Sequence, residues 1–235
     1  MKTIRKTLTF LFVASLTLLS CSDDDDSNYT CNELPTKVVE VVNPTTGKIW
    51  MDRNLGASRA ATSMTDELAY GDLYQWGRRA DGHQCRNSNT ITTLSSTAQP
   101  DHGDFIIETV ENDYNWGDPQ NFDLWQGVNG INNPCPTGFR LPTIAELKAE
   151  LFSWSSEDSA GAFASPLKFT MSGTRSVSGR ILNGTPGESK NNYWSSTLNN
   201  GKYPRQLAIA VNSESTRYGP ATGTFNGNAI RCIKN

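Results

Sequence analysis

The stretch Asn133-Pro134-Cys135-Pro136-Thr137-Gly138-Phe139-Arg140-Leu141-Pro142-Thr143-Ile144-Ala145-Glu146 decides most about how this chain folds. Within it, Thr143 and Glu146 have the spacing of a capping box. In this arrangement the threonine hydroxyl caps the first helical turn and the glutamate reaches back to the threonine backbone amide. The pattern predicts a helix from about Ile144 to Phe152.

This predicted helix is amphipathic. Ile144, Leu147 and Leu151 recur at the spacing that places them on one face, so we expect that face to be buried. Lys148 and Glu150 lie on the other side, which we expect to face water.

Two further elements are predicted before the helix. Polar and apolar residues alternate over 37–42, a segment rich in valine, and residues 48–55 are apolar on one face. The turn-forming residues of 43–47 lie between them, so the three segments together indicate a β-hairpin. Residues 66–79 place apolar side chains among helix formers and predict a second helix, which Gly71 weakens.

The second half of the chain has the pattern of an antiparallel sheet. Short β-prone runs alternate with turn residues, and the Asn-Gly dipeptides that begin at Asn183, Asn200 and Asn226 favour tight hairpin turns. The predicted strands are 167–171, 179–182, 193–197, 206–211 and 229–234. Helices followed by strands predict an α+β fold.

The N-terminus has the pattern of an export signal. Basic residues at Lys2, Arg5 and Lys6 precede an apolar run, residues 7–19, that is too short for a stable membrane span. Residues 1–20 are therefore predicted to be a signal peptide. The ending Leu18-Leu19-Ser20-Cys21 resembles the lipobox of bacterial lipoproteins, which implies that Cys21 becomes the lipidated first residue.

An acidic segment follows Cys21. Ser22 and the four aspartates 23–26 resemble the export signal of surface lipoproteins of Bacteroidota, which implies anchoring in the outer membrane with the domain facing the exterior. We expect residues 21–36 to be a flexible spacer and residues 37–235 to form one domain. Without the signal peptide, 18 basic residues stand against 24 acidic ones, a net charge of −6 that argues against nucleic-acid binding.

Four cysteines remain once Cys21 is assigned to lipid. An even number in an exported chain predicts two disulfides among Cys31, Cys85, Cys135 and Cys232, and three pairings are open. A zinc or redox site is disfavoured because no Cys-x-x-Cys occurs and no histidine lies near Cys135 or Cys232.

Four ordered blocks resemble one family, the Fibrobacter succinogenes major paralogous domain. The blocks are Gly47–Gly56, Tyr74–Arg78 with Asp81–His83, Asn133–Glu146, and Tyr193–Ser196 with Arg231–Lys234. The resemblance extends from about residue 40 to the last residue and implies a C-type lectin-like fold. It also implies that Cys135 pairs with Cys232, and therefore Cys31 with Cys85.

Enzymatic and metal functions find little support in the residues. Formylglycine-generating enzymes, which share the implied fold, need two reactive cysteines near the C-terminus, and here Cys232 alone follows Cys135. A calcium-dependent lectin would carry Glu-Pro-Asn or Gln-Pro-Asp followed by Trp-Asn-Asp. Gln99-Pro100-Asp101 matches the first part of this signature, but no Trp-Asn-Asp occurs. The candidate metal ligands read as ordinary turns; they are Asp81, His83, Asp101, His102 and Asp104. We therefore expect no catalytic site, no metal and no cofactor.

Aromatic residues supply the candidate binding site. Trp50, Trp76 and Trp194 lie inside the family blocks and are predicted to be core residues. The residues predicted to contact a ligand lie in polar, turn-rich segments, where function concentrates; they are Trp154, Tyr203, Arg217 and Tyr218.

A short motif adds a modification site. Asp158-Ser159-Ala160 resembles the O-glycosylation acceptor of exported Bacteroidota proteins, in a loop that we expect to be exposed. The leading function is that of a surface lipoprotein that binds a glycan or a surface protein without calcium. Two alternatives remain open: a structural or accessory subunit of a fimbrial tip or nutrient-uptake complex, and an enzyme of unknown type.

Overall fold

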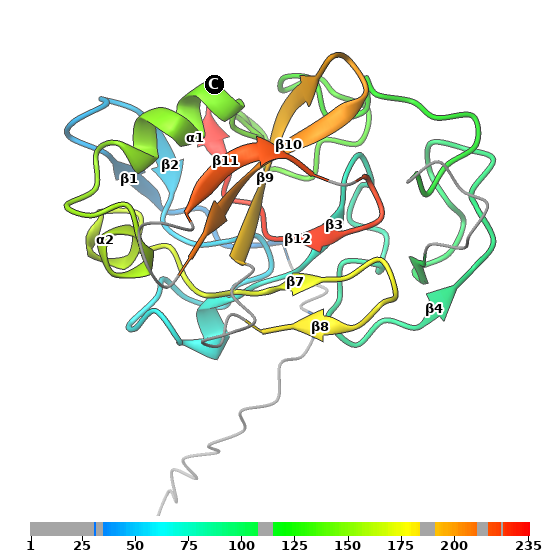
Figure 1. Cartoon of the computed structure of the whole chain (residues 1–235), viewed down its shortest axis with the longest axis horizontal. Helices are drawn as coiled ribbons and strands as arrows, with labels where there is room; N and C mark the ends of the chain where they lie inside the picture. The colour runs from blue at the N-terminus through cyan, green and yellow to red at the C-terminus, as the bar shows by residue number, and fades with distance from the viewer. Residues whose placement is uncertain (1–30, 32–34, 108–114, 184–190, 211–215, 222) are drawn as a thin grey trace, which may run out of the picture.

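A computed structural model describes residues 31, 35–107, 115–183, 191–210, 216–221 and 223–235. In this part of the chain the fold is α+β, mostly sheet with two short α-helices, α1 (Ile144–Leu151) and α2 (Ser159–Ala164), and a 3-10 turn η1 (Glu67–Ala69) (Figure 1). The strands are β1 (Glu40–Val42), β2 (Ile49–Met51), β3 (Tyr74–Gln75), β4 (Thr90–Ile91), β5 (Phe105–Ile106), β6 (Phe139–Arg140), β7 (Thr174–Arg175), β8 (Ile181–Leu182), β9 (Asn191–Asn199), β10 (Tyr203–Ile209), β11 (Arg217–Pro220), β12 (Gly227–Asn228) and β13 (Ile233–Lys234).

The first sheet joins the two ends of the domain. Its strand order is β1-β2-β13-β6, and Ile233 of the last strand pairs with Trp50 on one side and Arg140 on the other. The predicted hairpin of β1 and β2 is confirmed, with an antiparallel register that pairs Val41 with Trp50. The sequence block that carries β6 and α1 is thus paired directly with the last strand, which in turn pairs with β2 of the first hairpin.

The second sheet, β11-β10-β9, is antiparallel and packs against α1, which contacts β9 and β10 (Figure 1). The tight turn predicted at Asn200-Gly201 is confirmed, because both residues have positive φ, 52° and 68°, as a two-residue hairpin turn requires. Gly184 of the Asn183 dipeptide lies outside the described residues. The Asn226 dipeptide does not form a turn, because Gly227 begins β12.

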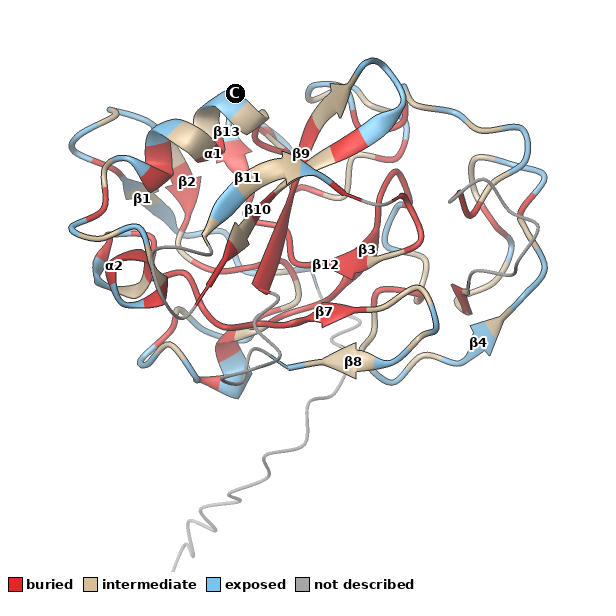
Figure 2. Cartoon of the chain, in the orientation of Figure 1, coloured by how far each residue is buried: buried red, intermediate tan, exposed pale blue. Residues whose placement is uncertain are grey.

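Short strands complete the lower part of the molecule. A third sheet has the order β3-β12-β7-β8 with antiparallel pairs, and β4 pairs with β5 in parallel. Figure 2 shows β3, β7, β12 and the inner part of β9 as buried. The three tryptophans predicted as core residues, Trp50, Trp76 and Trp194, are at most 1% exposed, which confirms that prediction.

The predicted helix at the opening stretch is confirmed, including its capping box. Thr143 Oγ1 accepts from Glu146 N (3.2 Å), and Glu146 Oε2 accepts from Thr143 N (2.8 Å). Burial by itself would raise the pKa of Glu146, but hydrogen bonds from Arg140 and from Thr143 outweigh it and lower the pKa to about 2. The cap and the ion pair with Arg140 fix the start of α1.

One part of the helix prediction is wrong. Glu150 does not face water but is completely buried, where its carboxylate accepts hydrogen bonds from the Asn43 amide and from Trp154 Nε1 (3.0 Å). Burial raises the pKa of this carboxyl, although the two hydrogen bonds act in the opposite direction and lower it. The side chain therefore ties α1 to the turn after β1.

Two predicted elements do not form. Residues 66–79 contain η1 and β3 instead of a helix, because Gly71 adopts a φ of 68° and packs where a Cβ would lie 2.2 Å from Leu55 O. Residues 167–171 are not a strand; they are a largely buried segment that crosses the core without a ladder partner. Of the predicted strand at 229–234, only Ile233–Lys234 forms a strand, β13, while Ala229 makes an isolated bridge to Tyr193.

Both disulfides implied by the family resemblance are present. Cys31 pairs with Cys85 and Cys135 pairs with Cys232, with Cα–Cα distances of 5.3 and 5.9 Å. The first of these corrects the predicted spacer. Cys31 is held on the domain by its disulfide, and Thr36 Oγ1 accepts a hydrogen bond from Gly56 N (2.8 Å), so the spacer cannot extend to residue 36.

Candidate functional site

The prediction that Trp154 contacts a ligand is wrong. The side chain is 8% exposed, donates its Nε1 hydrogen bond to Glu150 and packs on Phe169 with ring centroids 5.6 Å apart. The turn-rich sequence around Trp154 concealed a core residue, because the ring folds back under the end of α1.

The remaining three predicted residues lie on the β11-β10-β9 sheet but do not form one site. Tyr203 begins β10 opposite Asn199, whereas Tyr218 on β11 pairs with Leu207. Four residues of strand separate Tyr203 from Leu207, which corresponds to about 13 Å. Arg217 is exposed, and its side chain projects from the opposite face of the sheet to Tyr218, because neighbouring strand residues alternate.

Tyr218 belongs to a cluster that we call the α1–β11 surface, formed by Lys148, Phe152 and Tyr218. The Lys148 ammonium lies 4.6 Å from the centroid of the Tyr218 ring and 5.5 Å from that of Phe152. The two rings make an edge-to-face pair with centroids 6.2 Å apart. Sequence reasoning missed Lys148 and Phe152 because only the packing of α1 against β11 brings them to Tyr218.

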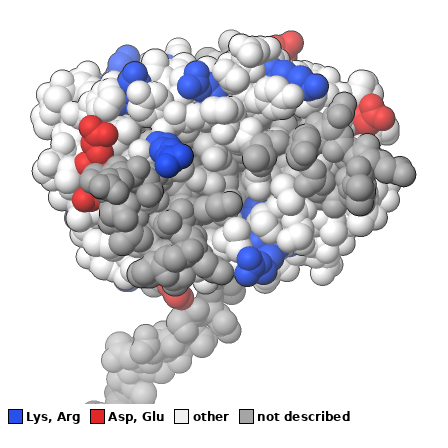
Figure 3. Space-filling model, in the orientation of Figure 1, with Lys and Arg blue, Asp and Glu red and all other residues white. Residues whose placement is uncertain are grey.

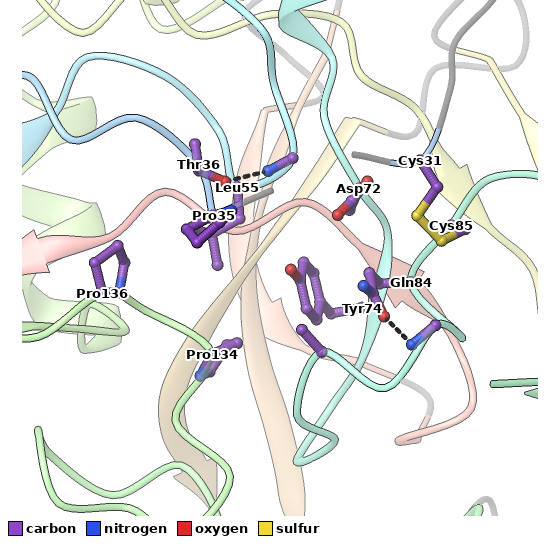
Figure 4. A pocket seen from close by; sticks show the side chains of 13 residues that line it. Cys31, Pro35, Thr36, Leu55, Asp72, Tyr74, Gln84, Cys85, Pro134 and Pro136 are labelled. Atoms are coloured by element: carbon purple, nitrogen blue, oxygen red, sulfur yellow. Dashed lines mark hydrogen bonds between the residues drawn. A yellow bond between two sulfur atoms is a disulfide. The ribbon is translucent and has the colours of Figure 1, made fainter. Parts of the chain in front are cut away.

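A cavity of about 580 Å³ lies beside Cys31, Pro35 and Thr36 of the N-terminal segment, and we call it the arm pocket (Figure 4). It is lined by Cys31, Pro35, Thr36, Leu55, Gly56, Asp72, Tyr74, Ala80, Gly82, Gln84, Cys85, Pro134 and Pro136. Figure 4 shows the three prolines on one side of Tyr74, and Asp72, Gln84 and the Cys31–Cys85 disulfide on the other. Four segments distant in sequence thus converge on one hollow.

Few polar groups enter this mostly apolar hollow, and some are held by the backbone. Gln84 Oε1 accepts from Gly82 N (2.9 Å), which leaves the amide nitrogen as the donor end of that side chain. Thr36 is oriented by its bond from Gly56 N. Gly56 has a φ of 79°, and a Cβ there would lie 2.2 Å from Asp72 Cγ, so only glycine lets Asp72 occupy this wall.

The wall of the arm pocket is rigid. Cys31–Cys85 forms part of it, and Cys135 of the second disulfide lies between Pro134 and Pro136. Rings and disulfides lose little freedom on ligand binding, so the pocket is preformed. Tyr74, Gly82, Pro134 and Pro136 belong to the sequence blocks noted above, but nothing in the sequence indicates that they enclose a space.

His83 lies beside the arm pocket in a turn, as predicted, in which Cys85 N donates to Gly82 O (3.2 Å), and its side chain belongs to a buried network. The imidazole is fully buried, its Nδ1 bonds the Asp81 carboxylate and its Nε2 accepts from Gln75 N (3.0 Å). These partners assign the neutral tautomer with the proton on Nδ1. Arg78 bonds the other oxygen of Asp81 (2.8 Å). Within the described ranges, no group of three or more Asp, Glu, His and Cys side chains is arranged to hold a metal ion.

This network predicts an acid dependence of stability. Burial, and then the charge of Arg78, lower the pKa of His83 to about 4 in the folded protein, against about 6.5 when unfolded. Between these values the unfolded chain binds a proton that the native protein does not, so the free energy of unfolding falls as the pH is lowered from 6.5 to 4. Urea unfolding at pH 7.5, 6 and 5 should show a smaller fall for His83→Gln than for the wild type. Parallel pH profiles of the two proteins would contradict the assignment.

The predicted glycosylation acceptor, Ser159, is not exposed. Ser159 is 5% exposed and begins α2, its backbone amide donates to Ala210 O (2.9 Å), and Asp158 caps the helix through Gly161 N (2.9 Å). The prediction of an exposed acceptor is wrong, because the motif is used for helix capping.

No helix in the described segments has the length and apolar character needed to span a bilayer.

Comparison with known proteins adds no assignment to this geometry. A scan against family models, a search of curated proteins and a search of solved structures each find no match to the chain.

Proposed function

We propose that this protein is a lipid-anchored surface protein whose single domain binds a glycan in the arm pocket without calcium. The observation that carries the proposal is the pocket itself, a rigid hollow with a small set of hydrogen-bonding groups in an apolar wall. The proposal extends to a C-type lectin-like arrangement of the domain, which is supported by the four sequence blocks and by the position of β13 between β2 and β6.

The chemistry of the arm pocket suits a sugar ring. A pyranose has apolar C–H faces and a rim of hydroxyls, and most ligand sites combine an apolar lining with a few well-placed polar groups. The prolines and Leu55 provide apolar contacts, while the Gln84 amide and the Asp72 carboxylate provide a donor and an acceptor for hydroxyls. A fully apolar ligand would bury the Gln84 amide nitrogen without a partner, which costs about 1–3 kcal/mol.

The proposed anchor places the domain close to the membrane. With Cys31 held by its disulfide, nine residues, 22–30, separate it from the proposed lipid cysteine Cys21. Ten residue steps can span at most about 35 Å. A ligand of this domain would therefore be met near the cell surface.

A blocking substitution tests the proposal. Ala80 lines the pocket but is exposed, so Ala80→Trp should fill part of the hollow without disturbing the core. A glycan array probed with residues 22–235, in calcium and in EDTA, should identify a ligand with equal signal in both buffers. We expect Ala80→Trp to weaken binding to that ligand at least tenfold in titration calorimetry.

A matched control is Ala160→Trp, which adds the same ring at an exposed position of α2. It should leave affinity unchanged. Equal binding by Ala80→Trp and the wild type, or a signal that EDTA abolishes, would refute calcium-independent binding in the arm pocket.

A further inference from the structure

We propose that the α1–β11 surface is a second contact site, specific for a polysaccharide that carries carboxylate groups. This inference does not rest on the arm pocket. It starts from Lys148, Phe152 and Tyr218, which lie on α1, at its C-terminal end and on β11.

The three side chains form an ordered cationic and aromatic group. The Lys148 ammonium lies over both ring faces, and such contacts hold a flexible lysine in place. The Phe152 ring is 55% exposed, which is unusual for a phenylalanine, while Tyr218 is partly buried against the core. A ligand thus meets a fixed positive charge beside an open aromatic ring.

The charge of Lys148 is not neutralised within the described residues. Both carboxylates of α1 are engaged elsewhere: Glu146 makes a bidentate ion pair with Arg140 (2.8 and 2.9 Å), and Glu150 is buried. Among the described side chains, no carboxylate lies within ion-pair distance of Lys148. A bound anion would supply the missing partner.

Further positively charged side chains lie near the α1–β11 surface. Figure 3 shows several Lys and Arg side chains along the upper edge of the molecule, over α1 and the β9–β10 hairpin, with one acidic side chain among them; the other acidic side chains lie toward the sides and the lower edge of this view. The chain as a whole is acidic, with a net charge of −3. A local excess of positive charge on an acidic protein attracts anions to this face.

The spacing of charge and ring favours an acidic sugar over other anions. The ammonium lies 4.6 and 5.5 Å from the two ring centroids, and a uronic acid carries its carboxylate on the ring whose C–H face can stack on Phe152. An acidic peptide would need the cation but not the open ring face. A membrane surface would need several projecting apolar side chains, and the cluster offers Phe152 as its one strongly exposed apolar side chain.

The test uses residues 22–235 with both disulfides intact and three probes: oligogalacturonate, its methyl-esterified form and poly-glutamate. We expect oligogalacturonate to bind with an affinity that falls as salt is raised, because the contact is partly ionic. Esterification, which removes the charge, and poly-glutamate, which lacks the sugar ring, should each reduce affinity at least tenfold.

Variants distinguish this surface from the arm pocket. Lys148→Gln and Phe152→Ser should each weaken oligogalacturonate binding at least fivefold, and both positions are exposed enough to leave thermal unfolding nearly unchanged. Lys48→Gln, at an exposed lysine in the turn after β1, and Ala80→Trp should have no effect. Absence of binding, equal binding of poly-glutamate or of anionic vesicles, or full binding by Lys148→Gln would overturn the inference.

Discussion

Replacing Cys135 and Cys232 together by alanine is expected to lower the free energy of unfolding by about 4 to 5 kcal/mol, the largest effect we predict for a change in this chain. The disulfide spans 97 residues, and the loss of a crosslink over so long a loop returns much conformational freedom to the unfolded chain. Both cysteines are at most 9% exposed, and alanine is suitable at these buried positions because its methyl group needs no hydrogen-bond partner. Urea unfolding followed by tryptophan fluorescence measures the difference.

The matched control is the double variant Cys31→Ala with Cys85→Ala. Its loop spans 54 residues, so the same argument predicts a loss of about 4 kcal/mol, somewhat smaller than for Cys135 and Cys232. The two double variants should therefore rank in this order. A loss below about 2 kcal/mol for the Cys135 and Cys232 variant would show that loop length does not set its contribution.

Asn54→Ala is expected to lower the free energy of unfolding by about 3 kcal/mol or more, because it leaves a buried guanidinium without its main acceptor. Asn54 Oδ1 accepts from Arg231 Nε (3.0 Å) and Nη2 (2.9 Å), and both residues are at most 1% exposed. The amide of Asn54 also donates to Tyr70 O (3.0 Å). The same unfolding measurement applies.

A double-mutant cycle isolates this pair. Arg231→Met removes the buried charge while keeping much of the side-chain volume, so Asn54→Ala should cost much less in the Arg231→Met background than in the wild type. A coupling energy above about 1 kcal/mol is expected. Additive losses would show that Asn54 acts through its contact with Tyr70 and the η1 segment, and not through Arg231.

The elements that could be predicted from sequence are those whose cause is local. The α1 cap depends on two side chains three residues apart, and the Asn200-Gly201 turn depends on the φ angles of its own two residues. The predicted helix over 66–79 failed for the opposite reason. Gly71 packs against Leu55 in a left-handed conformation, a contact that no short window of sequence contains.

The candidate site was predicted in part. Tyr218 was identified as a ligand candidate, but its partners Lys148 and Phe152 come from a helix 66 to 70 residues earlier in the chain. The prediction for Trp154 was wrong because an aromatic side chain in a polar segment can point either to solvent or into the core. Here the indole points into the core, where its Nε1 donates a hydrogen bond to Glu150. The arm pocket is made by four separate segments, so composition and spacing carry no signal for it.

The sequence by itself determined the start of α1, the hairpin of β1 and β2, the α+β class and, through the family resemblance, the pairing of four cysteines. These depend on neighbouring residues or on a recognisable block. The tertiary structure alone decided that Cys31 ends the spacer, that Glu150 is buried, and that Lys148 meets Phe152 and Tyr218. Such contacts join residues that are far apart along the chain, and their energies exist only once the core has packed.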